Sequence, residues 1–125
     1  MKQEIKSTKA PGAIGPYSQA TLVGNLVFVS GQLPINAETG AMPEDIKAQT
    51  KQSIENIKAI LAEVNATLDN VVKTTVFLAD MSLFGPMNEV YAEEFKAPFP
   101  ARCAYAVKEL PKQALVEIEV IAAVR

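Results

Sequence analysis

The chain has 125 residues, of which 49% are hydrophobic and 21% are charged, and its formal net charge is −2. This length is typical of one domain with a substantial core, so we expect a single domain over residues 1–125. The sequence contains no histidine and one cysteine, Cys103. These counts exclude Ser-His-Asp and Cys-His catalysis, an internal disulfide, and zinc sites built from histidine or several thiolates.

Charge and hydropathy bear on location and partners. Lysine and arginine are scattered along the chain and form no basic stripe, so nucleic acid is an unlikely partner. No run of apolar residues is long enough for a membrane span. The first six residues lack the apolar stretch of a secretory signal. Together with the single cysteine, these features predict a cytoplasmic protein without a membrane partner.

The predicted elements follow the order β-β-β-α-β-α-β-β. Gly24-Asn25 is typical of a type II′ turn between the second and third strands. In the first helix, Ile54, Ile57 and Leu61 share one face at helical spacing. Ser82 is a candidate N-cap of the second helix. In chain order the elements are strands over residues 3–7, 18–23 and 26–31, a helix over 45–65, a strand over 71–79, a helix over 83–95, and strands over 102–107 and 115–124.

The order of elements predicts an α/β (α+β) fold with one sheet. Strand-helix-strand connections are almost always right-handed, which places both helices on the same face of that sheet. The strands over 71–79 and 115–124 nevertheless carry apolar residues on both faces. The face without helices therefore needs a partner, and another copy of the chain is the simplest one. We expect a homo-oligomer.

Arg102 is the first candidate for binding a ligand. It alternates along its strand with Ala104 and Ala106, so its small neighbours leave room above that face. The guanidinium fork suits a carboxylate, although a surface ion pair explains the residue equally well. Cys103 should point to the opposite face, and we expect it to be a small buried hydrophobe.

Glu117 and Glu119 alternate along the last strand and should share one face. A carboxylate on a mostly apolar strand can act as a general base, especially where burial raises its pKa. For two strand glutamates taken alone, a solvated polar face is the commoner situation.

Asn88 shares a predicted helix face with three aromatic residues, Phe84, Tyr91 and Phe95. An amide on an apolar face needs hydrogen-bond partners, either a substrate or, somewhat more commonly, a loop backbone.

Tyr17 follows Gly15-Pro16, and Ser30-Gly31 ends a strand. Each could line a pocket, but Tyr17 could equally be a packing ring and Ser30-Gly31 a simple strand end. From the residues alone, the sequence indicates an oligomeric α/β domain with a capacity to bind a small carboxylate, and it leaves the reaction open.

Four blocks of the sequence resemble the RidA/YjgF family (reactive intermediate deaminase A). They occur in the expected order and span nearly the whole chain. The blocks are Ala-Ile-Gly-Pro-Tyr-Ser-Gln-Ala at 13–20, Ser-Gly-Gln-Leu-Pro at 30–34, Asn-Glu-Val-Tyr at 88–91, and a C-terminal signature of Pro-Ala-Arg at 100–102, Val-Lys-Glu-Leu-Pro-Lys at 107–112 and Val-Glu-Ile-Glu-Val-Ile-Ala at 116–122.

The resemblance implies a chorismate-mutase-like fold and a homotrimer in which the sheet faces form a central barrel. It further implies active sites in the clefts between subunits. The family's deaminases hydrolyse 2-iminobutanoate and 2-iminopropanoate to 2-oxo acids and ammonia, and they use no metal or organic cofactor.

Carried over by position, the resemblance implies that Arg102 clamps the substrate carboxylate and that Glu117 positions or activates the attacking water. Ala104 stands where the family usually has cysteine, while this chain has Cys103 one place earlier. That place mainly offers backbone contacts, and the departure bears on pocket shape and substrate range. The remaining positions that match pocket residues are Tyr17, Ser30, Gly31 and Asn88.

Two other functions stay open. The first is a ligand-responsive regulatory or interaction module that binds small carboxylates without catalysis. A sensor needs no base, so Glu117 beside Arg102 on an adjacent strand would favour an enzyme. The second is a ribonuclease, for which the sequence offers neither a histidine pair nor a basic groove.

Overall fold

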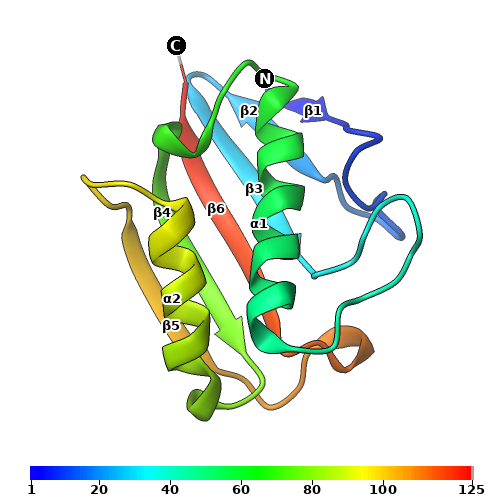
Figure 1. Ribbon diagram of the computed structural model, residues 1–125. Helices are drawn as coiled ribbons and strands as arrows, with labels where there is room; N and C mark the ends of the chain where they lie inside the picture. Colours follow the sequence, from blue (N-terminus) through cyan, green and yellow to red (C-terminus); the bar gives the residue numbers. More distant parts are fainter. Residues whose placement is uncertain (125) are drawn as a thin grey trace.

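The computed structural model describes residues 1–124, which form a six-stranded sheet with two helices against one face (Figure 1). The predicted order of elements and the α+β fold are confirmed. Gly24 has a φ of +58°, as the predicted turn between the second and third strands requires. The elements are β1 Gln3–Ile5, β2 Ala20–Val23, β3 Leu26–Gln32, α1 Ile46–Ala62, β4 Val71–Leu78, α2 Phe84–Glu94, β5 Ala101–Ala106 and β6 Val116–Ala123.

The strand order is β1-β2-β3-β6-β4-β5. The β4–β5 pair is parallel and the other pairs are antiparallel. Both helices lie on one face of this sheet, as right-handed connections predict (Figure 1). Because β6 lies between β3 and β4, the last strand runs through the middle of the sheet. Its buried residues Ile118 and Val120 belong to the core.

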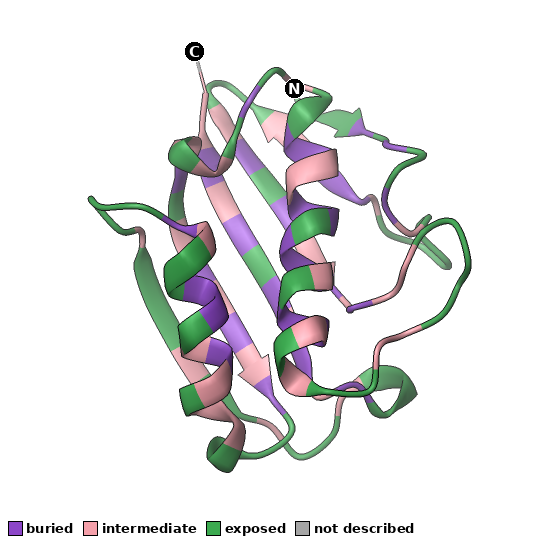
Figure 2. Cartoon of the chain, viewed as in Figure 1, coloured by how far each residue is buried: buried purple, intermediate pink, exposed green. Residues whose placement is uncertain are grey.

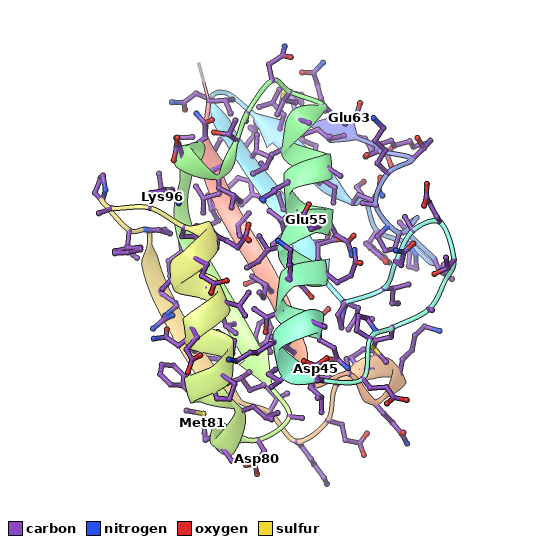
Figure 3. All side chains as sticks on the ribbon, viewed as in Figure 1. Asp45, Glu55, Glu63, Asp80, Met81 and Lys96 are labelled. Carbon is purple, nitrogen blue, oxygen red and sulfur yellow. The ribbon has the colours of Figure 1, made fainter. Side chains whose placement is uncertain are left out.

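The first helix packs by the face that its sequence predicts. Ile54, Ile57 and Leu61 are fully buried. Asp45 caps the N-terminus, where its carboxylate accepts a hydrogen bond from the backbone N–H of Ala48 at 3.3 Å (Figure 3).

Ion pairs connect the outer sides of the two helices. Glu94 of α2 lies 2.7 Å from Nζ of Lys58 and 3.0 Å from Nζ of Lys51, both on α1. The side chain of Glu94 is only 13% exposed, so this pairing helps to fix α2 beside α1.

The predicted N-cap of the second helix is wrong. Ser82 lies inside a short 3-10 turn, Met81–Leu83, and α2 itself begins at Phe84 without a side-chain cap. Asp80 precedes the turn, and its carboxylate accepts a hydrogen bond from the backbone N–H of Ser82 at 2.8 Å (Figure 3). Asp80 therefore caps this short turn, and the start of α2, for which we predicted Ser82, has no side-chain cap.

On the strands, buried and exposed residues alternate, and the buried ones face the two helices (Figure 2). Over residues 1–124, the opposite face of the sheet is covered by no helix. Val23, Phe28 and Tyr105 of β2, β3 and β5 are exposed at 44%, 41% and 47%, so this face carries apolar residues. Cys103 is also exposed, so its predicted burial is wrong. The reason is that β5 forms an edge of the sheet and no element covers this face of it.

Candidate active site

Arg102 projects from β5 towards α2. Its Nη1 donates a hydrogen bond to Oδ1 of Asn88 at 2.6 Å. Its Cζ lies 4.7 Å from the ring centroid of Tyr91 and 5.3 Å from that of Phe84. The rings and the amide thus hold the guanidinium in place. Because Arg102 is exposed, other donors of its fork can reach a carboxylate from solvent.

The helix face predicted around Asn88 is confirmed, because Phe84, Asn88 and Tyr91 all contact Arg102. The Asn88 amide accepts its hydrogen bond from this side chain and not from a loop backbone. Its position therefore links it to the candidate carboxylate binder.

Tyr91 is a candidate residue that our sequence analysis did not select. Its hydroxyl forms a 2.8 Å hydrogen bond with the hydroxyl of buried Thr74 on β4. Burial raises the pKa of Tyr91, against the opposing effects of the Thr74 hydrogen bond and the charge of Arg102. The ring is therefore neutral and fixed beneath the guanidinium. Its spacing of three residues from Asn88, on the same helix face, is the signal that could have identified it.

Glu117 lies on β6 and faces away from the helices. It is half-buried, and it pairs in register with Phe77 of β4, while Glu119 pairs with Thr75. The two carboxylates share one sheet face, as predicted. Burial raises the pKa of Glu117, and the nearby charge of Glu119 raises it further. A carboxylate with a raised pKa is a stronger general base than an ordinary exposed glutamate.

Gly31 lies directly against the Glu117 carboxyl. A Cβ atom at position 31 would lie 2.6 Å from Oε2 and 2.9 Å from Cδ of Glu117. Only glycine leaves this space free, which explains the residue better than a simple strand end does. Next to it, the Ser30 hydroxyl donates a 2.6 Å hydrogen bond to the backbone oxygen of Ser18. Ser30 thereby joins β3 to the segment that carries Tyr17.

Tyr17 and Gly31 border a cavity of about 390 Å³, which we call the loop pocket. It lies between the segment that precedes β2, the loop that follows β3, and the turn before β6. Tyr17 is 53% exposed. Its ring is therefore available to a ligand and does not pack in the core.

The predicted site residues form two separate groups. One group holds Arg102 and Asn88 on the helix side of the sheet, with half-buried Ala104 farther along β5. The other holds Glu117 against Gly31 on the opposite side. Arg102 and Glu117 do not lie on adjacent strands, because β4 separates β5 from β6, so the arrangement that would favour an enzyme over a sensor is not formed within one chain. Within one chain, these two side chains point to opposite faces of the sheet and cannot reach the same small substrate.

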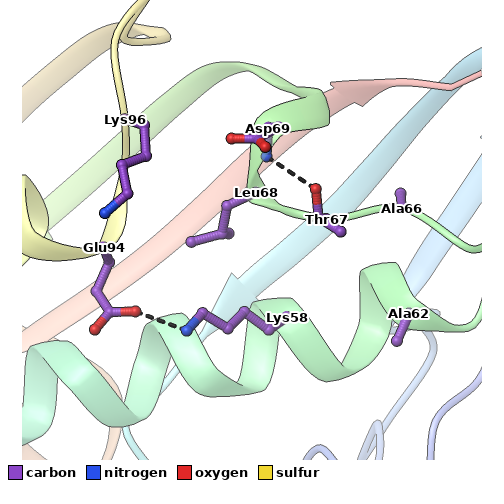
Figure 4. Close-up of a pocket in the computed structure, with 8 residues that line it drawn as sticks. All are labelled: Lys58, Ala62, Ala66, Thr67, Leu68, Asp69, Glu94 and Lys96. Carbon is purple, nitrogen blue, oxygen red and sulfur yellow. Dashed lines mark hydrogen bonds and ion pairs between the residues drawn. The ribbon is translucent and has the colours of Figure 1, made fainter.

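A second cavity, of about 380 Å³, lies apart from these groups (Figure 4). Ala62 and Ala66 line it near the end of α1, together with Leu68 in the turn before β4. Lys58 and Glu94 border it as the ion pair already described. None of the site residues predicted from sequence lines this cavity.

Metal-ligand and membrane-spanning arrangements are not found in the part of the chain that the structure describes. Residues 1–124 contain no group of three His, Cys, Asp or Glu side chains placed to hold a metal ion. Over the same residues, neither helix has the length and hydropathy needed to cross a membrane.

Comparison with known proteins decides the family. A sequence model described as Endoribonuclease L-PSP matches residues 7–124. The 2-iminobutanoate/2-iminopropanoate deaminase of Escherichia coli is 43% identical over 125 residues, covering 98% of this chain and 98% of the relative. The chain belongs to the RidA/YjgF family. Relatives at 42–43% identity are named as deaminases, so imine deamination is an activity of this family.

Two further comparisons support the assignment to the RidA/YjgF family. A RutC family protein of Pyrococcus abyssi is 57% identical over 122 residues, covering 97% of this chain and 96% of the relative. The crystal structure of E. coli TdcF with bound serine has a TM-score of 0.95 and 40% identity, and the match covers 98% of this chain and 99% of that one. The family predicted from the four sequence blocks is confirmed, and so is a single sheet with two helices on one face.

Proposed function

We propose that this protein is a homotrimeric deaminase that hydrolyses 2-imino acids, including 2-iminobutanoate and 2-iminopropanoate, to 2-oxo acids and ammonia. The observation that carries the proposal is the pair of groups on the two sheet faces. One presents a fixed guanidinium that can bind a carboxylate. The other group presents the Glu117 carboxyl, which has a raised pKa and lies beside Gly31, a residue with no side chain to displace it.

A complete site requires more than one copy of the chain. Because Arg102 and Glu117 face opposite sides of the sheet, a site that uses both must combine Arg102 of one subunit with Glu117 of its neighbour. The exposed Phe28 and Tyr105 on the open face offer apolar surface for this assembly. We propose a trimer in which the open faces surround a central barrel and the sites lie in the clefts between subunits.

In the proposed reaction, the guanidinium of Arg102 binds the substrate carboxylate, a charge-assisted contact worth about 1.5–3 kcal/mol. Asn88 and the Tyr91 ring keep the guanidinium oriented. Tyr17, Ser30 and Ala104 would complete the wall around the substrate.

Glu117 holds a water molecule and takes a proton from it as the oxygen adds to C2 of the protonated imine. The resulting carbinolamine carries the former imine nitrogen as an amino group. Glu117 returns the proton to this nitrogen, and the C–N bond breaks to release ammonia. The carboxylate then takes the hydroxyl proton as the C=O bond of the 2-oxo acid forms, and it passes this proton to the departing ammonia, which leaves as ammonium. Orientation and one proton shuttle are sufficient for this hydrolysis, with no cofactor. The single cysteine supports the cytoplasmic location that we propose for this activity.

A coupled imine assay tests the proposal. An amino-acid oxidase generates the imine, semicarbazide traps what remains, and the rate of 2-oxo acid release is measured. We expect the wild type to accelerate release and Arg102→Ala and Glu117→Ala to lose the acceleration while remaining trimeric. Lys96→Ala, at an exposed position outside both groups, is the matched control. Wild-type protein that fails to accelerate hydrolysis of several imines would overturn the proposal.

A carboxylate-responsive regulatory module is the second candidate, because exposed Arg102 can bind a carboxylate without help from Glu117. Titration calorimetry with 2-oxobutanoate separates the two functions. A sensor binds the ligand and accelerates no imine hydrolysis, whereas the deaminase does both.

RNA cleavage, the activity in the description of the family model, receives no support from the charges. The lysines on the outer side of α1 pair with carboxylates of α2 and of α1 itself. This face therefore lacks the basic stripe of a nucleic-acid binder.

A further inference from the structure

The loop pocket has a mostly apolar wall. Ile14, Leu33 and Ile35 contribute aliphatic side chains to it, and Tyr17 contributes a ring. Its volume of about 390 Å³ falls within the range of small-molecule sites and is far larger than a methyl or ethyl group needs. A substrate with a longer side chain could therefore occupy it.

Two amides that line the pocket are already used within the protein. The Gln19 amide donates to the backbone oxygen of Ser7 at 3.0 Å and accepts from the backbone N–H of Ser7 at 2.8 Å. Asn36 accepts from the backbone N–H groups of Glu38 and Thr39. Gln32 also lines the pocket, and its amide donates to the backbone oxygen of Ser30 at 3.1 Å. The Tyr17 hydroxyl and the Lys112 ammonium line the pocket as well and can meet a ligand.

Lys112 is held at the pocket by an unusual turn. Its φ and ψ are 57° and 23°, and Gln113 follows with a φ of 57°, so two successive non-glycine residues are left-handed. The turn is fixed at its end, where the backbone N–H of Leu115 donates to Oε1 of buried Gln49 at 2.8 Å. Backbone strain of this kind persists where the surroundings impose it, often at ligand sites.

The charge in the pocket is of one sign. Among the described residues that line it, Lys112 is the charged side chain and no carboxylate is present. An anionic group entering the pocket would therefore meet a cation and no carboxylate among the lining residues, while the Glu117 carboxyl lies against Gly31 at the border of the pocket.

The pocket adjoins the proposed reaction centre through a shared residue. Gly31 lines the pocket, and its Cα hydrogen points at the Glu117 carboxyl that would hold the attacking water. Gly31 therefore borders both the loop pocket and Glu117.

We infer that the loop pocket binds the substrate's side chain and selects 2-imino acids that have a hydrocarbon stem and a terminal carboxylate. The stem would contact Leu33 and Ile35, and the carboxylate would pair with Lys112. This inference rests on the proposed deaminase function and names a substrate class for it.

The test compares kcat/KM for 2-iminoglutarate with kcat/KM for 2-iminohexanoate, a neutral imine with a side chain of similar length. Lys112→Met keeps the stem and removes the charge, and it places no additional demand on the left-handed backbone. We expect Lys112→Met to lower the ratio of the two values about tenfold. Lys96→Met, which removes an exposed cation outside the pocket, should leave the ratio unchanged.

Activity on 2-iminobutanoate separates the inference from the function on which it rests. If wild type hydrolyses 2-iminobutanoate and Lys112→Met keeps the wild-type ratio, the inference is wrong and the deaminase function stands. If wild type hydrolyses none of the three imines, the deaminase function fails and the inference falls with it.

Discussion

Replacing Gly31 with alanine would place a methyl group against the Glu117 carboxyl. The new Cβ would lie 2.6 Å from Oε2, whereas ordinary van der Waals contact begins at 3.4 Å, so the carboxyl must retreat by about 0.8 Å. The backbone does not oppose the substitution, because Gly31 is not among the glycines with positive φ. The substitution therefore acts mainly on the position of the proposed base.

The size of the effect follows from that displacement. Misplacing a reacting group by about 1 Å can cost a factor of about 100 in rate, or about 2.7 kcal/mol in the barrier. We expect Gly31→Ala to lower kcat by about this factor. The KM should change less, because Arg102 of the other group binds the substrate carboxylate. The flexible Glu117 side chain can move aside, so stability should change by about 0.5 kcal/mol or less.

A double-mutant cycle in the imine assay tests this reasoning. Gly85→Ala, where a Cβ would meet nothing within 4 Å, is the matched control. Because both changes act on one carboxylate, Gly31→Ala should add no further loss in a Glu117→Ala background. Full kcat in a folded, trimeric Gly31→Ala protein would refute the reasoning. A loss in the Glu117→Ala background as large as in the wild type would also refute it.

Three further outcomes are expected. Burial raises the pKa of Glu117, and the charge of Glu119 raises it further. The acidic limb of the pH–kcat/KM profile should therefore lie at a higher pH than an ordinary glutamate would give, and Glu119→Gln should move this limb to lower pH. An acidic limb that does not move in Glu119→Gln would count against Glu117 as the base. Tyr91→Leu should raise KM several-fold, because it removes the ring beneath Arg102. Tyr91→Phe keeps the ring, so KM should stay near the wild-type value, while the free energy of unfolding should fall by about 1 kcal/mol through loss of the hydrogen bond to Thr74. Equal KM values for the two variants in steady-state kinetics would contradict this. Phe28→Glu should place charge on the open sheet face and shift the protein towards monomer in analytical ultracentrifugation; a stable trimer would argue against assembly through this face.

The sequence predicted the features that depend on local periodicity. The buried face of α1, with Ile54 and Ile57, follows from helical spacing, and the shared face of Glu117 and Glu119 follows from strand alternation. The contact of Asn88 with Arg102 also lies on a predicted helix face. The helix face of Asn88 and the sheet faces of the two glutamates each follow from the repeat of one element, whereas the contact between Asn88 and Arg102 joins two elements and was seen only in the structure.

Features that depend on the order of strands could not be predicted in this way. Local patterns do not reveal that β6 inserts between β3 and β4, so they could not show that Arg102 and Glu117 face opposite sides. Alternation likewise places Cys103 on a face without showing whether any element covers it. The N-cap prediction at Ser82 failed for a different reason: a 3-10 turn capped by Asp80 precedes α2, so Ser82 lies inside that turn and not at the start of the helix.

The central claim is that one deaminase site combines Arg102 of one subunit with Glu117 of its neighbour. Co-expressing Arg102→Ala and Glu117→Ala chains with different affinity tags, and purifying trimers that carry both tags, tests it directly. Either variant alone should be inactive in the imine assay. In every trimer that contains both variants, one of the three clefts combines an intact Arg102 with an intact Glu117, so the mixed trimers should recover about a third of the wild-type activity. Mixed trimers no more active than either variant alone would contradict the account.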